Sequence, residues 1–216
     1  MTNDLFDFSD GEPWRESIGD GIVVLRRFAL KAAPELIQEI GALALQAPFR
    51  NMITPGGHAM SAAMTCAGRL GWVTDRAGYR YQSTDPDSGR PWPAMPESFL
   101  ALASAAAEEA GFAGFVPDAC LINRYQRGAR MGLHQDKDEQ DFSWPIVSVS
   151  LGLPITFQFG GPKRSDTPVK IPLEHGDVVV WGGAARRFYH GVLTLRAGHH
   201  PLTGPCRYNL TFRRAG

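Results

Sequence analysis

The second half of the chain, from Cys120 to the C-terminus, is a succession of short apolar runs separated by turn residues. The runs are rich in β-branched and aromatic residues and too short for helices, which is typical of buried strands. About eight strands are expected, the number that fits a jelly roll. They lie at 120–125, 133–136, 146–151, 155–159, 169–173, 178–181, 188–192 and 207–212. We therefore expect an α+β, mainly β fold: a double-stranded β-helix (jelly roll) with supporting helices.

Two earlier segments carry apolar residues at helical spacing, so each should pack against a sheet. Pro34 and Pro48 bracket the first segment. Its apolar positions are Leu36, Ile37, Ile40, Leu43 and Ala44. Pro96 opens the second, and Gly111 should end it in the left-handed conformation. Its apolar face comprises Phe99, Leu102, Ala103 and Ala106. A β-branched run at 21–25 predicts one buried strand before the first helix.

Between these helices, residues 51–95 show no sustained periodicity and are rich in glycine and proline. Such segments form hairpins and surface loops, which often carry recognition. Met64, Trp72, Tyr79 and Tyr81 are interleaved here. They form either a satellite core or flat surfaces on which a base can stack. The expected organisation is a tail at 1–15, a strand and helix packed on the core at 16–50, an N-terminal lid at 51–95 and the jelly-roll core at 96–216.

Charge and cysteine content exclude several classes of protein. The 22 Lys and Arg residues equal the 22 Asp and Glu residues, so there is no overall basic charge for tight nonspecific binding of nucleic acid. Cys66, Cys120 and Cys206 form neither a CxxC motif nor a zinc spacing, as expected for reduced thiols. The acidic N-terminus predicts no signal peptide, and no apolar stretch could span a membrane. We expect a cytoplasmic protein without a membrane partner.

The run that contains His134 and Asp136 is the strongest candidate for a metal site. On an extended backbone residues i and i+2 point the same way, so this pair presents an imidazole and a carboxylate together. His190, on a neighbouring strand, would add a second imidazole. Two histidines and one carboxylate form the site of non-haem Fe(II) oxygenases. A zinc hydrolase can use the same ligands, and a loop carboxylate beside an ordinary histidine is the simplest alternative.

The last expected strand alternates polar and apolar residues. Arg207, Asn209 and Arg213 share one face, and the opposite face is apolar. Two arginines turned into a barrel are unfavourable without an anionic ligand, and a dicarboxylate would offer one carboxylate to each guanidinium. An exposed polar face on an edge strand is the alternative. Asn123 and Tyr125 show the same i, i+2 spacing and could add neutral donors to the same acid.

Four motifs together resemble the AlkB family of Fe(II)- and 2-oxoglutarate-dependent dioxygenases along nearly the whole chain. They are Asn123-x-Tyr125, His134-x-Asp136-x-Asp138, His190 and Arg207-x-Asn209-x-Thr211-Phe212-Arg213. The stretches Met64-Thr65 and Leu70-Gly71-Trp72 resemble the nucleotide-recognition region of that family. The resemblance implies Fe(II), 2-oxoglutarate and dioxygen as cofactor and co-substrates. It also implies removal of methyl groups from 1-methyladenine and 3-methylcytosine, with formaldehyde, succinate and carbon dioxide as products.

The resemblance implies roles for three groups of residues. Iron would be held by His134, Asp136 and His190. The residues that would hold 2-oxoglutarate are Arg213 and Asn123 nearer the metal, Arg207 and Tyr125 at the far carboxylate, and Asn209. The base pocket would comprise Thr54, Met64, Trp72, Tyr79, Asp138 and Arg164. Trp72 would stack on one face of the base and His134 on the other, while Asp138 would face its positive charge.

Two lid residues depart from the family pattern. His58 stands where an aromatic phenol is usual and Cys66 where an asparagine is common, and both departures bear on substrate preference. The expected partners are alkylated single-stranded DNA, and also double-stranded DNA and RNA, with no obligate protein partner.

Two other interpretations fit the same core. One is a related dioxygenase that acts on a protein side chain, a lipid or a small molecule, which the lid aromatics argue against. The other is a jelly-roll binding protein or nucleic-acid reader with a structural metal and no turnover. The paired arginines argue against that second interpretation, because a structural metal site has no use for them.

Overall fold

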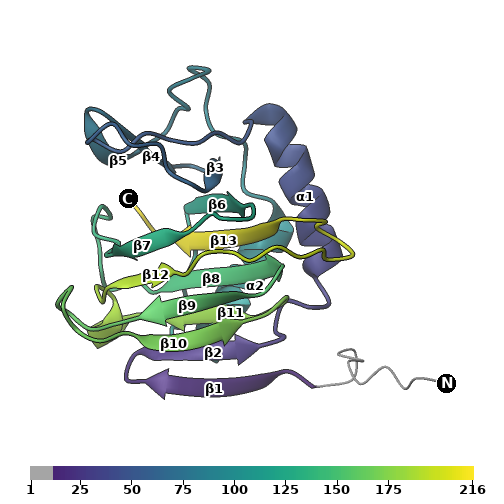
Figure 1. The fold of residues 1–216 in the computed structure, drawn as a ribbon, viewed down its shortest axis with the longest axis vertical. Coiled ribbons are helices and arrows are strands. Elements are labelled where there is room, and N and C mark those ends of the chain that lie inside the picture. Colours follow the sequence, from purple (N-terminus) through teal and green to yellow (C-terminus); the bar gives the residue numbers. More distant parts are fainter. Residues whose placement is uncertain (1–11) are drawn as a thin grey trace.

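The computed structural model describes residues 12–216, and Figure 1 shows how their helices and strands are arranged. In chain order the elements are β1 (Trp14–Gly19), β2 (Ile22–Arg26), α1 (Ala33–Gln46), β3 (Ala63–Gly68), β4 (Gly71–Asp75), β5 (Gly78–Gln82), α2 (Glu97–Glu109), β6 (Ala119–Tyr125), β7 (Met131–His134), β8 (Ile146–Gly152), β9 (Ile155–Phe159), β10 (Val169–Leu173), β11 (Val178–Trp181), the short 3-10 helix η1 (Gly183–Ala185), β12 (His190–Val192) and β13 (Arg207–Arg213). The expected tail at 1–15 falls mostly on residues 1–11, which lie outside the described residues.

Two antiparallel sheets form the body of the molecule. The larger has the strand order β1-β2-β11-β8-β13-β6-β3, and the smaller has the order β10-β9-β12-β7. Side chains from their facing surfaces form one core: Trp181 of β11 lies 5.9 Å from Phe157 and 6.1 Å from Phe159 of β9, measured between ring centroids. Two facing antiparallel sheets are the jelly roll that the strand pattern predicts.

A second core lies between the larger sheet and the helices, which cover its outer face (Figure 1). Leu36 and Ile40 of α1 and Phe99 of α2 are buried there, as the helical spacing predicts. Phe99 meets Phe212 of β13 edge-on, with 5.8 Å between ring centroids. Full burial of such a ring stabilises the fold by roughly 1.5–3 kcal/mol. The helices thus hold the apolar face of β13 and turn its polar face toward the smaller sheet.

The position of β13 excludes the alternative of an exposed edge strand. β13 pairs with β6 on one side and with β8 on the other, in the interior of the larger sheet. Arg207 is only 1% exposed and Arg213 only 6%. The polar face therefore requires partners inside the protein.

The strand bounds agree closely with expectation for β9, β10 and β11 and differ at β7 and β12. β7 ends at His134, two residues before the expected end, and β12 begins at His190. After β7 and before β12 the two segments are joined by a side chain instead of by strand pairing. Gln135 Nε2 donates to the backbone oxygen of Arg187, at 2.6 Å. Asp136 therefore lies on a loop and not on the expected strand.

Two features of the N-terminal half differ from the sequence prediction: strand β1 and the strands within residues 51–95. β1 is an edge strand with a mainly exposed, polar sequence, paired only with β2, so it has no apolar alternation to reveal it. Within residues 51–95, β3 is buried and pairs with β6 in the larger sheet, whereas β4 and β5 form a separate hairpin. This segment therefore supplies both a core strand and the hairpin at the top of Figure 1.

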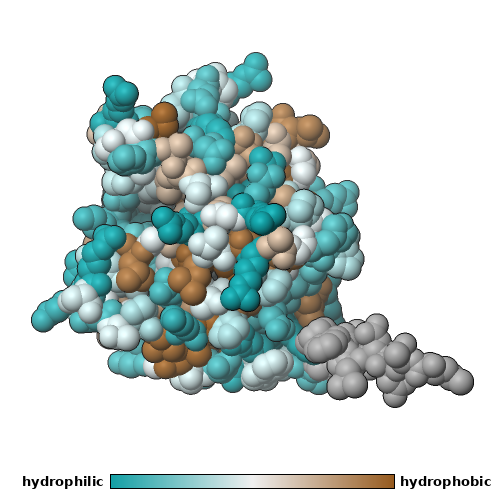
Figure 2. All heavy atoms as spheres, viewed as in Figure 1, coloured by the Kyte–Doolittle hydropathy of each residue, from teal (hydrophilic) through white to brown (hydrophobic). Residues whose placement is uncertain are grey.

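Large apolar side chains on the surface are dispersed. On the face shown in Figure 2 the hydrophobic residues form separate spots among hydrophilic ones. The exposed examples are Trp14, Leu45, Ile53, Tyr79, Val116, Val169, Leu193 and Leu202. Neither α1 nor α2, nor any other described helix, has the length and apolar character that crossing a membrane requires.

Candidate metal centre and co-substrate site

Three side chains from two neighbouring strands and the adjoining loop converge at one point. β7 and β12 are antiparallel neighbours, and their register places His134 opposite His190. His134 Nε2 lies 3.7 Å from Asp136 Oδ1, and His190 Nε2 lies 3.7 Å from Asp136 Oδ2. The ligand atoms of all three lie within 4.8 Å of one another. One metal ion can therefore reach two imidazoles and one carboxylate.

Backbone carbonyls fix the protonation of both imidazoles. His134 Nδ1 lies 2.9 Å from Gly132 O, and His190 Nδ1 lies 3.0 Å from Phe188 O. Because a carbonyl oxygen only accepts, each ring carries its proton on Nδ1 and leaves Nε2 free for a metal. Burial, with the neighbouring His134, lowers the pKa of His190 to about 4. His190 is therefore neutral, and able to ligate, at physiological pH.

The carboxylate of the cluster is held ionised by an arginine. Burial opposes ionisation of Asp136, but Arg213 and the two histidines hold the pKa of its carboxyl well below the ordinary range. Arg213 donates to Asp136 Oδ2 through Nε at 3.0 Å and Nη2 at 2.5 Å. Arg213 thus lies beside the carboxylate of the His134–Asp136–His190 cluster.

The second arginine of β13 is buried without an anionic partner. Arg207 Nη2 donates to Ser150 Oγ at 2.7 Å and Nη1 donates to Leu153 O at 3.3 Å. Its Nε has no partner among residues 12–216, and no carboxylate of that range forms an ion pair with it. Burial lowers the pKa of Arg207 to about 10. A buried guanidinium without a counter-ion is costly, which indicates a place for an anionic ligand.

Neutral polar groups fill the space between the two arginines. Asn209 Nδ2 donates to Ser148 Oγ at 2.8 Å, and Asn123 Nδ2 donates to Asn209 Oδ1 at 3.3 Å. Tyr125 lies opposite Arg207 in the strand register. Burial raises the pKa of Tyr125 to about 12, so its phenol stays protonated and can donate. This inward face carries a guanidinium at each end and neutral polar groups between and beside them, of which the Tyr125 phenol can still donate to a carboxylate.

The β4–β5 hairpin is attached to the loop that follows the metal carboxylate. Trp72 and Tyr81 are cross-strand neighbours in the hairpin. Trp72 Nε1 donates to Asp138 Oδ2 at 2.8 Å, and the Tyr81 hydroxyl donates to Glu139 Oε1 at 2.8 Å. Tyr79 stacks on Trp72, with ring centroids 5.7 Å apart. Aromatic rings of the lid segment are therefore fixed beside the metal cluster.

Comparison with known proteins agrees with this geometry. The model of the 2OG-Fe(II) oxygenase superfamily matches residues 21–213, from the beginning of β2 to the end of β13. The chain belongs to the 2OG-Fe(II) oxygenase superfamily. The expected family and fold class are confirmed. As a dioxygenase of this superfamily, the enzyme uses Fe(II), 2-oxoglutarate and dioxygen.

Individual relatives place the chain more narrowly within the superfamily. It is 61% identical over 209 residues to the alpha-ketoglutarate-dependent dioxygenase AlkB of Escherichia coli (strain K12), with 97% of each chain covered. It is 33% identical over 177 residues to the DNA N(6)-methyladenine demethylase ALKBH1C of Arabidopsis thaliana, covering 70% of this chain and 38% of that protein. The solved structure of OsALKBH1 has a TM-score of 0.80 at 30% identity, covering 93% of this chain and 100% of that chain.

Three other residues predicted for the base pocket form no hydrogen bond or ion pair with the metal cluster. Thr54 closes a tight turn, since its hydroxyl accepts the amide of His58 at 3.2 Å. Met64 is fully buried on β3, where its side chain is part of the core cluster. Arg164 is exposed on the loop between β9 and β10. That loop is hydrogen-bonded to Tyr189, next to His190. All three roles stay predictions.

The structure also adds polar residues that the sequence reasoning missed. Ser148 and Ser150 of β8 bond to Asn209 and Arg207. Their signal was available, because two serines alternate with apolar residues in the run 146–151 and so share one face with period two. Glu139 and Arg186, which form a buried ion pair at 3.1 Å, had no such signal. Burial and pairing between distant loops are not visible in a spacing pattern.

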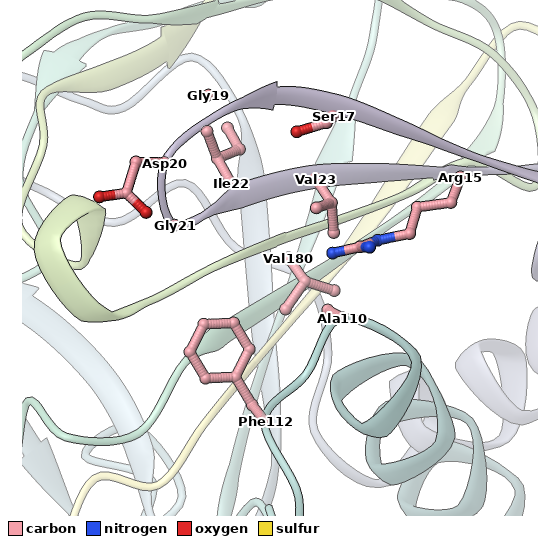
Figure 3. A pocket seen from close by; sticks show the side chains of 10 residues that line it. All are labelled: Arg15, Ser17, Gly19, Asp20, Gly21, Ile22, Val23, Ala110, Phe112 and Val180. Atoms are coloured by element: carbon pink, nitrogen blue, oxygen red, sulfur yellow. The ribbon is translucent and has the colours of Figure 1, made fainter.

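A cavity of about 380 Å³ lies elsewhere on this 2OG-Fe(II) oxygenase (Figure 3). It opens between the β1–β2 turn region and the C-terminal end of α2, where Arg15 and Phe112 approach it from opposite sides (Figure 3). None of the predicted site residues lines it. This cavity therefore does not mark the candidate site, which the titratable cluster at β7 and β12 indicates.

Proposed function

We propose that this enzyme reverses alkylation damage by oxidative demethylation of 1-methyladenine and 3-methylcytosine in DNA and RNA. The observation that carries this proposal is the aromatic pair Trp72 and Tyr79, held beside the metal cluster through Asp138. Flat aromatic surfaces bind bases by stacking and tolerate different sequences. The similarity to a dioxygenase and to a DNA demethylase supports the same substrate class.

Within the site we assign His134, Asp136 and His190 to Fe(II). We assign the two carboxylates of 2-oxoglutarate to the ends of β13: Arg213 and Asn123 nearer the metal, Arg207 and Tyr125 at the far end, and Asn209 between them. The free Nε of Arg207 supports this arrangement, since it is a buried donor without a partner among residues 12–216. The ion pair of Arg213 with Asp136 supports the assignment of that arginine to the metal end.

Fe(II), with 2-oxoglutarate and dioxygen, supplies the oxidation that hydroxylates the N-methyl carbon and yields succinate and carbon dioxide. The task of the chain is to hold the methyl carbon at the metal and to exclude water. The hydroxymethyl adduct then loses formaldehyde and restores the base. This last step requires no nucleophilic side chain.

The base would lie between Trp72 and His134, with Tyr79 at the rim. Both substrate bases carry a positive charge, and Asp138 would present a carboxylate to it in a partly buried pocket. Because methylation blocks Watson–Crick pairing, such a base is extruded from a duplex at less cost than a normal one. Single strands are therefore preferred to duplexes, the substrates being alkylated single-stranded DNA, double-stranded DNA and RNA, and no obligate protein partner is needed.

We place the lid in residues 51–62 and 69–95, leaving β3 to the core, with Thr54, Met64 and Arg164 around or beneath the base. The other proposed divisions, 16–50 and 96–216, follow the sequence expectation. We propose the cytoplasm as the compartment, which the three free cysteines support.

A substrate panel tests the proposal. Formaldehyde and succinate are measured with Fe(II), 2-oxoglutarate and 3-methylcytosine in single-stranded DNA, in a duplex and in RNA, with a methylated lysine peptide as the competing substrate class. We expect formaldehyde from all three nucleic acids, fastest from the single strand, and none from the peptide. His190→Ala is the inactive control. Formaldehyde from the peptide alone would assign the enzyme to a protein substrate instead.

A further inference from the structure

Arg186 is a buried cation outside the predicted site, and its bonds lead to the metal cluster. It follows η1, between β11 and β12, and is 3% exposed. Its Nη1 donates to Asp136 O at 3.1 Å, its Nε donates to Trp144 O at 2.9 Å, and its Nη2 lies 3.1 Å from Glu139 Oε2. One planar guanidinium thus spans the beginning, middle and end of the loop between β7 and β8.

Glu139 connects this arginine to the other side of Asp136. Glu139 Oε1 lies 3.3 Å from Arg213 Nε, and Arg213 donates to Asp136 Oδ2. The contacts form a closed ring through Arg186, Glu139, Arg213 and Asp136. Asp136 is therefore held at its backbone carbonyl by one arginine and at its carboxylate by the other.

The same region joins the two segments that carry the histidines. Gln135, next to His134, donates its Nε2 to Arg187 O at 2.6 Å, three residues before His190. Burying two guanidiniums and two carboxylates costs desolvation energy that their attraction offsets only partly. Such a ring is therefore weak as a source of stability, but it sets the direction of the Asp136 carboxylate.

We propose that Arg186 is a positioning residue for the metal centre: by fixing the loop 136–144 it aims the Asp136 carboxylate and so sets the affinity and the ligand geometry of the metal ion. The inference rests on the proposed assignment of Asp136 to Fe(II). Outer groups that orient metal ligands typically change metal affinity by 10–100-fold when they are replaced.

Arg187 supplies a matched control within the chain. The guanidiniums of Arg186 and Arg187 both lie over the ring of Phe142, at 5.4 Å and 5.3 Å from its centroid. Arg186 is buried and its side chain bonds to the Asp136–Glu139 segment, whereas Arg187 is exposed. The contact of Arg187 with Gln135 uses the Arg187 backbone carbonyl and not its side chain. Replacing the Arg187 side chain should leave the ring of ion pairs intact.

The experiment titrates metal-free protein with Co(II) alone and records its dissociation constant and its visible absorption at saturation. Arg186→Lys keeps the charge but cannot span the three acceptors. It should raise the dissociation constant roughly tenfold or more and change the absorption of the saturated protein. Arg187→Lys should match the wild type in both. Glu139→Gln, which keeps the side-chain volume, should change both quantities in the direction of Arg186→Lys and serves if Arg186→Lys does not fold.

Two results would overturn the positioning role. One is an Arg186→Lys protein with wild-type affinity and absorption. The other is a variant with a lower melting temperature but an unchanged spectrum at saturation, since that is purely structural behaviour. Failure of the ligand assignment itself looks different: His190→Ala would then bind Co(II) as tightly as the wild type, and the inference would fall with it.

Discussion

At the scale of single residues, Asp138 combines two properties that substitution can separate. Its carboxylate carries the charge proposed to attract a cationic base, and it also accepts the bond from Trp72 Nε1. Asp138→Asn keeps an oxygen that can accept this bond and removes the charge. Asp138→Ala removes both, so it releases Trp72 as well. The pair of variants therefore distinguishes electrostatic selection from simple positioning.

We expect Asp138→Asn to lower kcat/KM for 3-methylcytosine DNA about tenfold more than for neutral 3-methylthymine DNA, as a partly exposed charge interaction of about 1–2 kcal/mol requires. Asp138→Ala should lower both values. The measurement is formaldehyde release from oligonucleotides that differ only in the lesion. Equal losses for the two lesions in Asp138→Asn would rule out selection by charge.

Trp72 provides the second test at this scale. Loss of a stacking surface typically costs about 1–3 kcal/mol per base, so Trp72→Ala should raise the KM for methylated oligonucleotide about tenfold. Succinate formed without nucleic acid should stay near the wild-type rate, because Trp72 is not part of the proposed metal or 2-oxoglutarate sites. Trp72→Phe keeps a ring and loses the Nε1 donor, so its KM for methylated oligonucleotide should lie between those of the wild type and Trp72→Ala. A collapse of succinate formation in Trp72→Ala would make Trp72 a structural residue.

At the scale of elements, alternation and apolar runs predicted the strands that carry at least one buried apolar face. β9, β10 and β11 begin and end where the sequence indicated. The inward face of β13 was also predictable, because period two leaves no other place for Arg207 and Arg213 once Leu210 and Phe212 are buried against the helices. β1 escaped prediction because an edge strand with one exposed face has little apolar signal.

The site was predictable where its chemistry follows local spacing. His134 and Asp136 are two residues apart, and His190 is brought opposite His134 by strand register. The ring that contains Glu139 and Arg186 was not predictable, since it joins two loops through burial and ion pairing. The conformation of such loops is set by side-chain hydrogen bonds and ion pairs, and their sequences show no periodicity from which it could be predicted. For the same reason β7 ends before Asp136.

The attachment of the β4–β5 hairpin to the core can be tested at Gly71. A Cβ at this position would lie 2.3 Å from the Trp92 ring and 2.9 Å from Cys66 Cβ. Trp92 is buried and donates its Nε1 to Gln82 O at the end of β5. Gly71→Ala should therefore displace the hairpin and lower the free energy of unfolding by about 1–3 kcal/mol.

The matched control for Gly71→Ala is Gly41→Ala, on the exposed face of α1, where nothing lies within 4 Å of an added Cβ. It should leave stability unchanged or raise it by about 0.5–1 kcal/mol, because alanine favours a helix over glycine. Urea unfolding measures both variants. A Gly71→Ala protein as stable as Gly41→Ala would show that the hairpin packs more loosely on Trp92 than described.

At the scale of the whole molecule, the site exists only when both sheets are assembled. β13 and β6 of the larger sheet supply the arginines and neutral donors, whereas β7 and β12 of the smaller sheet bring the two histidines together. The helices pack on the outer face of the larger sheet, against β13. The β4–β5 hairpin is bonded to Asp138 and Glu139, beside the metal cluster. Equal numbers of acidic and basic residues leave selectivity to local charges such as these.

Acid should destabilise the whole fold through histidines remote from the metal cluster. His175 Nδ1 accepts the amide of Gly152 at 2.9 Å, and its ring lies 4.3 Å from that of His200, between centroids. Burial, with His200, lowers the pKa of His175 from 6.5 to about 4, so the unfolded chain takes up a proton at higher pH than the folded chain.

The free energy of unfolding should therefore fall between pH 6.5 and about 4, by at most about 1.4 kcal/mol per pH unit for each such proton. Carboxyls with lowered pKa values, such as Asp85, begin to lose their contribution as the pH approaches 3.8, so they add to the decline only at the acid end of this range. Urea unfolding of chelator-treated protein across this range measures the slope. His175→Asn keeps an acceptor for the amide but cannot titrate, and it should make the decline less steep, leaving the share of His190, whose pKa is also lowered to about 4. An unchanged slope in this variant would place the acid sensitivity elsewhere in the protein.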